Sequence, residues 1–267
     1  MIDAHVHVWQ LGRNGCTWPD ASLPGIHRDF AVDDALAEAR ANGIDDILLV
    51  QSQEAAADTE WLLDQAAGHH MVAGVVGWTD IGDAHAVESL AAENALRGLR
   101  PMVQDREADW YDRPELDAGF AAMASRGIVL DALVRPQHLA SLERLARRHP
   151  QLRIVIDHGA KPDPAGDLAA WNEAMRSIAR CPNVACKLSG LLTELAPGQP
   201  GEAVAPVFTL LWDAFGADRL IWGSDWPVLT LAGTYAGWLD QARALVPTAH
   251  QNAVFGGNAR QIYGLAR

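Results

Sequence analysis

The sequence lacks the features that mark membrane and secreted proteins. No stretch approaches the roughly 18 consecutive apolar residues that predict a membrane-spanning helix. The N-terminus shows no basic segment followed by an apolar one, so no secretory signal peptide is expected. The three cysteines, Cys16, Cys181 and Cys186, are odd in number and follow no zinc or CxxC spacing. We therefore expect a cytoplasmic protein with free thiols and no membrane partner.

Basic residues are also scarce. Lys and Arg number 21 against 34 Asp and Glu, which gives a formal net charge of −13. A chain this acidic repels phosphate backbones, which argues against nucleic acid as a partner. The 49% of hydrophobic residues is typical of a globular protein. A homo-oligomer is compatible with these numbers, which do not decide the oligomeric state.

Short apolar segments alternate with helix-like segments along the whole chain. Such nearly continuous Val, Ile and Leu runs predict parallel strands covered on both faces. The length of 267 residues is close to the roughly 250 of one TIM barrel. We predict a single α/β domain over residues 1–267, a (β/α)₈ TIM barrel. A doubly wound open sheet is the alternative, but the expected glycine-rich phosphate turn is not found. The predicted strands are Ile2–Val8, Asp46–Ser52, Val72–Thr79, Leu96–Met102, Ile128–Val134, Leu152–Asp157, Val184–Ser189 and Leu220–Ser224.

Histidines occur at the end of the first predicted strand. Side chains alternate along a strand, so His5 and His7 point to the same side. Two imidazoles on one face can chelate a divalent metal ion or polarise a carbonyl group. Two packed, purely structural histidines are the alternative.

Two further strands end in polar residues. The sixth predicted strand ends in Asp157-His158, and the last runs into Asp225. In a barrel, the C-terminal ends of all strands meet at the active face. Asp225 there can serve as a general base or metal ligand, or can simply cap a turn before Pro227. The sequence therefore predicts a site built from His5, His7, His158 and Asp225.

Longer motifs carry a resemblance to a known family. The segments HVH, LRGLRPMVQ, VLDALVRP, DHGAKP, VACKLSGLLTEL and DAFGADRLIWGSDWPV resemble the amidohydrolase superfamily. Within it they look like the sugar-acid lactonase branch, whose members act on L-fucono- and L-rhamnono-lactones. Pyrone-dicarboxylate lactonases are more distant relatives. The resemblance covers nearly the whole chain.

The resemblance implies a hydrolase that opens a cyclic ester. It places His5, His7 and His158 around the lactone carbonyl and makes Asp225 the base that activates water. It also places Arg100 and Lys187 where they would bind a carboxylate or sugar hydroxyls. For Lys187, a buried ion pair with Asp3, Asp131 or Asp157 is the alternative. Three tryptophans at predicted strand ends would form walls for the substrate ring: Trp78, Trp222 and Trp226.

The chain departs from the family pattern in ways that bear on metal. Pro101 stands where relatives often carry a histidine, the fourth strand has no lysine for carboxylation, and the fifth ends without histidine. We therefore expect no strictly required cofactor, or one divalent ion held by the three histidines and Asp225, with zinc favoured by imidazole ligands. Two other functions remain open: a mononuclear metal-dependent amidohydrolase or decarboxylase acting on a non-lactone, and a non-catalytic sugar-binding barrel.

Overall fold

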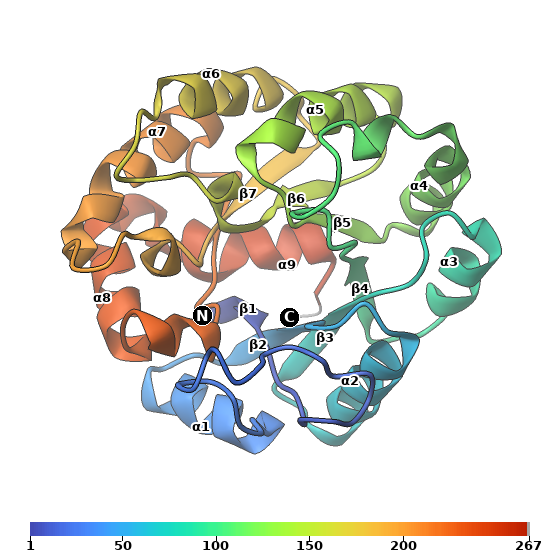
Figure 1. Cartoon of the computed structure of the whole chain (residues 1–267), viewed down its shortest axis with the longest axis horizontal. Coiled ribbons are helices and arrows are strands. Elements are labelled where there is room, and N and C mark those ends of the chain that lie inside the picture. Colours follow the sequence, from blue (N-terminus) through green and yellow to red (C-terminus); the bar gives the residue numbers. More distant parts are fainter. Residues whose placement is uncertain (266–267) are drawn as a thin grey trace.

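The computed structural model describes residues 1–265, and eight parallel strands form one sheet in chain order, β1 to β8 (Figure 1). This confirms the predicted (β/α)₈ barrel. His7, Arg100 and Asp157 directly follow the ends of the first, fourth and sixth strands, so they stand at the barrel mouth. The strands are β1 Ile2–Val6, β2 Asp46–Val50, β3 Val72–Gly77, β4 Leu96–Leu99, β5 Val129–Ala132, β6 Ile154–Ile156, β7 Val184–Leu188 and β8 Leu220–Trp222.

Helices form an outer ring around these strands (Figure 1). Amphipathic patterns place them there: α5 buries Leu139, Leu142 and Leu145 against the barrel and leaves its arginines outside. Gly127, with φ 69°, ends α4 in the left-handed conformation that glycine adopts readily. The helices are α1 Val32–Ala41, α2 Ala56–Gly68, α3 Ala84–Leu90, α4 Asp117–Arg126, α5 Leu139–Arg148, α6 Ala169–Ile178, α7 Ala205–Phe215, α8 Tyr235–Leu245 and α9 Asn258–Tyr263.

Two elements are short. The helix α3 ends at Leu90, because residues 91–95 form turns that lead directly into β4. The segment 250–263 is divided by a π-type turn at Ala253–Gly257, and only α9 remains α-helical at its end. Nine short 3₁₀ or π-type segments, labelled η1 to η9, complete the structure described.

The barrel closes between its first and last strands. Val6 pairs with Trp226 in a parallel bridge, the His7 amide donates to the Trp226 carbonyl at 2.7 Å, and the Asp225 amide donates to the His5 carbonyl at 2.9 Å. Gly223 permits this approach, because a Cβ there would lie 2.7 Å from the His5 Cβ. The seam therefore brings two segments more than 200 residues apart into contact at the mouth.

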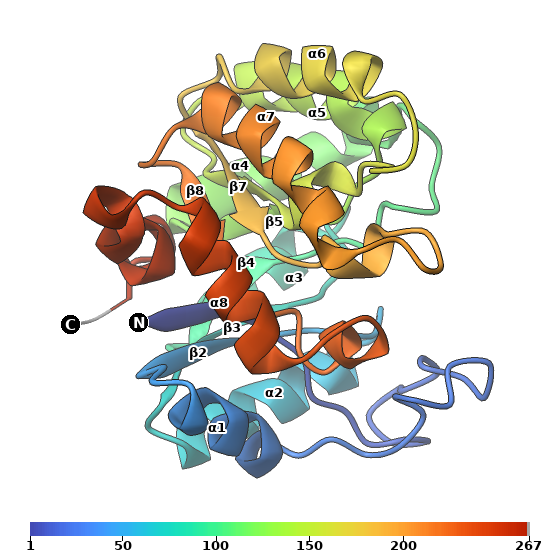
Figure 2. The same cartoon turned by 90° about the vertical axis from the view of Figure 1, so that its left-hand side faces the viewer.

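The opposite end of the barrel is covered by the C-terminal helix. Ala259, Tyr263 and Leu265 pack with inner barrel residues such as Val155 and Ile221. Figure 2 shows this final segment beside the N-terminus of the chain. The mouth is thus the open end of the barrel.

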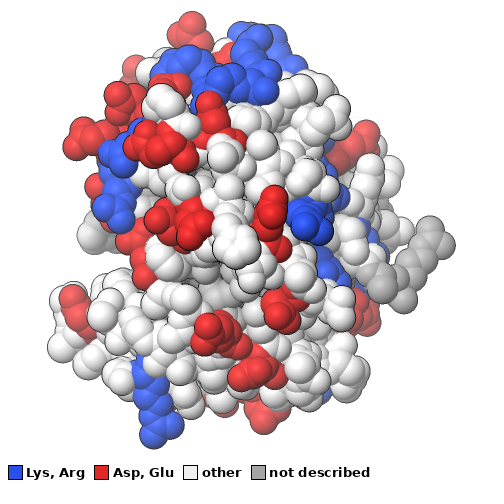
Figure 3. Space-filling model, turned by 90° about the vertical axis from the view of Figure 1, so that its right-hand side faces the viewer, with Lys and Arg blue, Asp and Glu red and all other residues white. Residues whose placement is uncertain are grey.

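The surface agrees with the acidic composition. On the face shown in Figure 3, acidic side chains are widely spread and basic ones occur in smaller groups. No helix within residues 1–265 has the length and apolar character needed to cross a bilayer.

Candidate active site

All four residues predicted for the site meet at the barrel mouth. His5 lies in β1 and His7 just beyond it, His158 follows β6, and Asp225 follows β8. The Asp225 Oδ1 atom lies 3.4 Å from His7 Nε2, 3.7 Å from His5 Nε2 and 4.0 Å from His158 Nε2. The two rings on β1 approach to 3.1 Å between their Nε2 atoms. The structure therefore forms one compact cluster of a carboxylate and three imidazoles.

Unusual backbone conformations direct two of these side chains. Asp225 has φ 61°, and His158 begins a run of left-handed residues that continues to Lys161 (φ 51°). Non-glycine residues pay for this conformation, and such strain concentrates at functional sites. The turn after β7 supports the strained loop: the Ser189 hydroxyl lies 2.9 Å from His158 Nδ1. A Cβ at Gly190 would lie 2.4 Å from that same nitrogen.

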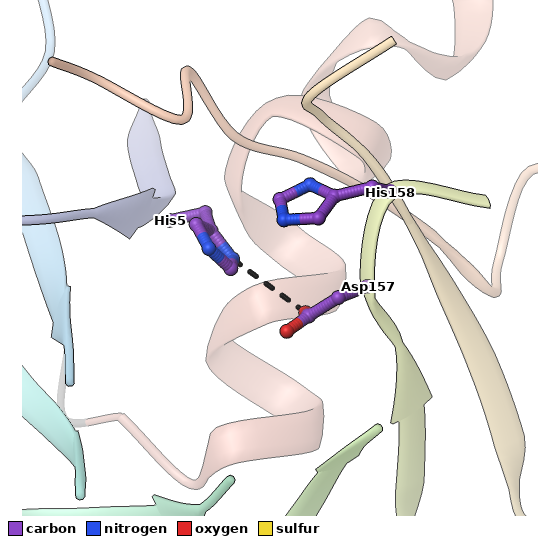
Figure 4. Close-up of side chains that lie close together, drawn as sticks. All are labelled: His5, Asp157 and His158. Carbon is purple, nitrogen blue, oxygen red and sulfur yellow. Dashed lines mark ion pairs between the residues drawn. The ribbon is translucent and has the colours of Figure 1, made fainter. Parts of the chain in front are cut away.

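A fully buried group of charges lies beneath the cluster. The Lys187 ammonium is 2.5 Å from Asp131 Oδ2, 3.1 Å from Asp157 Oδ1 and 3.0 Å from His5 Nδ1. Asp157 Oδ2 also lies 3.5 Å from the Arg100 guanidinium. Figure 4 shows the Asp157 carboxylate and the His5 ring pointing toward one another beside His158. Asp157 therefore lies between the cations Lys187 and Arg100 and the imidazole of His5.

Burial and neighbouring charges fix the protonation states. Burial lowers the pKa of His5 well below its usual value and that of His158 to about 4, so both rings are neutral near pH 7. Burial alone would raise the pKa of Asp225, but the polar contacts of His158, His7 and His5 lower it below its usual value. Because His5 and His158 are neutral, they stabilise the ionised Asp225 as dipoles rather than as full charges. Burial opposes ionisation of Asp157 too, yet Lys187 keeps its pKa well below normal.

A small cavity of ≈ 150 Å³ opens directly above this cluster. His7, His158, Asp225 and Arg100 line it, whereas His5 is fully buried behind them. The Arg100 guanidinium is anchored through the Gln51 carbonyl. The other lining residues come from several loops: Trp18, Ser52, Met102, Gln104, Leu133, Lys161 and Val228.

Four other predicted site residues lie outside this cavity. Lys187 is 0% exposed, and it forms the buried ion pair that was its alternative, with Asp131 and Asp157. Trp78 lines a neighbouring cleft that shares Met102 with the cavity. Trp222 packs against Tyr235 and Phe255, and Trp226 packs against Phe30.

Several cavity residues, and Asp157 beneath them, were not predicted as site residues. Five of the cavity residues lie in segments that carry the family resemblance: Lys161 in DHGAKP, Met102 and Gln104 in LRGLRPMVQ, Leu133 in VLDALVRP and Val228 in DAFGADRLIWGSDWPV. Asp157 opens the DHGAKP segment. Trp18 and Ser52 carry no motif, and only the positions of their loops bring them to the cavity.

The cluster has the donor set of a metal site. Within residues 1–265, two groups have ligand atoms within 4.8 Å of one another: His5, His7 and Asp225, and His5, Asp157 and His158. His7 Nδ1 donates to the Val50 carbonyl at 2.8 Å, which is the contact that metal-bound imidazoles usually make with their second nitrogen. His158 has a similar contact with Ser189. The donor set therefore fits one divalent ion, except that His5 turns its Nδ1 toward the Lys187 ammonium, where a metal-bound imidazole would face an acceptor.

Comparisons with known proteins agree with this architecture. The family model described as amidohydrolase matches residues 2–265. An L-fucono-1,5-lactonase of Burkholderia ambifaria is 44% identical, over 100% of this chain and 96% of that protein. An L-fucono-1,5-lactonase of Burkholderia multivorans is 32% identical, over 99% and 96%. A crystal structure of a zinc-bound amidohydrolase from Burkholderia multivorans has a TM-score of 0.93 at 31% identity, covering 99% of both chains.

The barrel and its mouth thus define an enzyme with a His–Asp centre suited to hydrolysis. The chain belongs to the amidohydrolase family. The resemblance to the sugar-acid lactonase branch is confirmed by these relatives.

Proposed function

We propose that this protein hydrolyses a sugar-acid lactone of the L-fucono or L-rhamnono type. The observation that carries the proposal is the meeting of His7, His158, Asp225 and Arg100 around one small cavity. The relatives named L-fucono-1,5-lactonase support the substrate class. Hydrolysis of a lactone needs a base for water, donors for the carbonyl oxygen and a proton for the ring oxygen, and the cavity offers each.

The cavity walls suit a 6-deoxy sugar lactone. Met102 and Leu133 form a parallel bridge at the ends of β4 and β5, across the barrel from β8 and β1. A lactone whose carbonyl faces Asp225 directs its far side toward this apolar pair. The methyl group is the one apolar substituent of a 6-deoxy lactone and would rest there. Ser52, Gln104 and Lys161 offer hydrogen-bonding groups for the ring hydroxyls.

The reaction proceeds in two steps. Asp225, ionised at neutral pH, takes a proton from a water molecule as the water oxygen attacks the lactone carbonyl carbon. Negative charge grows on the carbonyl oxygen, and Arg100 with the His158 ring, both of which line the cavity, stabilises it. The bond from the carbonyl carbon to the ring oxygen then breaks. Asp225 returns its proton to that oxygen, and the product is the open hydroxy acid.

His7, His158 and Asp225 are the residues that would hold a divalent ion, and His5 would join them only if its Nε2 carried no proton. Such an ion would polarise the carbonyl and lower the pKa of bound water. The hydrogen bond from His7 Nδ1 to Val50 leaves the lone pair of His7 Nε2 for such an ion.

A lactone panel tests the proposal. Purified enzyme is incubated with aldono-1,4- and 1,5-lactones in a pH-indicator assay, with and without a chelator, and Asp225→Asn serves as the control. We expect turnover of L-fucono- or L-rhamnono-lactone and little with the control. If the purified protein is folded with an intact active site but turns over no aldonolactone, the proposal is wrong. Loss of activity with chelator, restored by zinc, would assign the ion an essential part.

A further inference from the structure

The Lys187 ammonium is enclosed by buried partners. It donates hydrogen bonds to Asp131 Oδ2 at 2.5 Å and to His5 Nδ1 at 3.0 Å, and it forms an ion pair with Asp157 Oδ1 at 3.1 Å. The side chain is 0% exposed, so bulk water does not reach it. An ammonium can only donate, so the His5 Nδ1 atom that it contacts must present a lone pair.

This contact decides where His5 carries its proton. A neutral imidazole has one N–H, so a lone pair on Nδ1 leaves the hydrogen on Nε2. His5 Nε2 lies 3.1 Å from His7 Nε2, whose lone pair can accept in the metal-free cluster. Its other polar neighbours are more distant: Arg100 Nη1, a donor, at 3.5 Å and Asp225 Oδ1 at 3.7 Å. His7 is oriented in turn by the Val50 carbonyl, which can only accept from His7 Nδ1. The hydrogen bonds thus run in one direction, from Lys187 through His5 to His7 and Val50.

The same contact opposes metal binding by His5. A metal-bound imidazole coordinates through a lone pair and donates its other N–H to an acceptor. His7 matches this arrangement through Val50, but His5 faces the Lys187 ammonium where an acceptor belongs. Asp157 Oδ1 could accept from His5 Nδ1, but at 3.5 Å it is the more distant neighbour.

We propose that Lys187 is a positioning residue that holds His5 as its Nε2–H tautomer, so that His5 donates a hydrogen bond into the cluster instead of offering a lone pair to a metal ion. Lys187 acts through His5 and does not contact the substrate. Without Lys187, His5 can carry its proton on Nδ1 and donate it to Asp157. The lone pair of His5 Nε2 is then free to bind a metal ion. The inference rests on the proposed lactonase function only for its kinetic measurement.

The test compares a paired variant with a control in the same buried group. Lys187→Met combined with Asp131→Asn removes one charge of each sign, because Lys187→Met alone leaves buried carboxylates uncompensated. Tyr263→Phe is the control: it removes the 2.7 Å hydrogen bond to Asp131 but keeps the aromatic ring, which lies 5.5 Å from Lys187 Nζ. Histidine ¹⁵N NMR reports the tautomer, with His5 signals identified as those lost in His5→Asn. Calorimetric titration with zinc reports metal affinity, and neither method requires turnover.

We expect wild-type His5 to be protonated at Nε2 and bare at Nδ1. In the paired variant the proton moves to Nδ1 and zinc binds more tightly by about 10- to 100-fold, the usual span for contacts that orient a ligand. On any lactone turned over, kcat falls with KM little changed. Tyr263→Phe keeps the wild-type tautomer, affinity and kcat. If His5 of the wild-type protein is protonated at Nδ1, the proposal is wrong, even if the paired variant does not fold. The proposal is also wrong if the paired variant folds and its His5 tautomer and zinc affinity are unchanged. Failure of every lactone leaves these two measurements intact and counts against the proposed function alone.

Discussion

The Asp225 carboxylate lies among three imidazoles, and this decides how it can act as a base. Its pKa is below the usual value because, although burial opposes ionisation, His158, His7 and His5 stabilise the charge. Such a carboxylate is always ionised near pH 7 and therefore always ready to accept a proton. Because the lowered pKa means a low proton affinity, the proposed action of Asp225 as a base must depend largely on how the attacking water is positioned beside the carboxylate.

Replacing Asp225 by Asn keeps the size of the side chain and removes its proton acceptance. We expect kcat to fall by about 10²- to 10⁴-fold, the range for general acid–base catalysis, with KM little changed. Steady-state kinetics on the best lactone of the panel measure this. Full activity in Asp225→Asn would remove the assignment of Asp225 as base.

A second buried carboxylate makes stability depend on pH. Asp58 is 1% exposed, and burial raises its pKa to about 6 although it accepts from the amides of Ser52 and Gln53. The unfolded chain, with a pKa near 3.8, binds fewer protons than the folded chain between these values. This site therefore lowers stability as pH rises from about 4 to about 6 and has no further effect above that.

Asp58→Asn should remove this pH dependence, because the amide oxygen still accepts from the backbone but does not ionise. Relative to wild type, the variant should gain about 2 kcal/mol of unfolding free energy between pH 4.5 and pH 7. Urea denaturation of both proteins at each pH checks the difference. An equal difference at both pH values would contradict a raised pKa at Asp58.

At the scale of elements, the turn after β7 supports the loop after β6. Gly190 has φ 62° and lies against the His158 ring, so a side chain there is both strained and obstructed. Gly198 has φ 80° but an added Cβ would meet nothing within 4 Å. Substitutions at the two glycines can therefore distinguish the effect of backbone strain alone from the effect of displacing the His158 ring.

Gly190→Ala should lower kcat by at least about 10-fold, because His158 must move away from Asp225. Gly198→Ala should cost about 1 kcal/mol of stability through strain alone and keep full activity. Thermal unfolding and kinetics of both variants measure these effects. Equal activity in the two would show that the Gly190 contact does not position His158.

For the whole molecule, the C-terminal helix closes the barrel at the end opposite the active site. Tyr263 packs against inner barrel residues and donates to Asp131 at 2.7 Å. Burial raises the pKa of Asp131 to about 6, so this carboxylate depends on its partners. The lower layer of the barrel is therefore stabilised from a helix outside the eight βα repeats.

Tyr263→Ala should reduce the unfolding free energy by about 3–5 kcal/mol, as for other large aromatic side chains removed from a core. Tyr263→Phe should lose only the hydrogen bond, about 1.5–3 kcal/mol. Chemical denaturation gives both values. A smaller loss in Tyr263→Ala than in Tyr263→Phe would contradict the packing role of α9.

Much of the fold and the centre of the site followed from the sequence. Apolar runs alternating with helical patterns predict parallel strands, and the carboxyl ends of such strands converge at one mouth. His5, His7, His158 and Asp225 could be placed together for that reason. The resemblance carried by long segments such as DAFGADRLIWGSDWPV led to the family.

The tertiary structure alone decided which partners the buried charges have and which loops reach the cavity. Lys187 on β7 meets Asp131 on β5 and His5 on β1, so it lies beneath the cavity rather than in its lining. Trp18 and Ser52 enter the cavity from loops without any motif. A sequence pattern records which face of its own strand a side chain occupies, but the partner on that face comes from strands distant in the chain. Barrel closure and loop packing choose that partner.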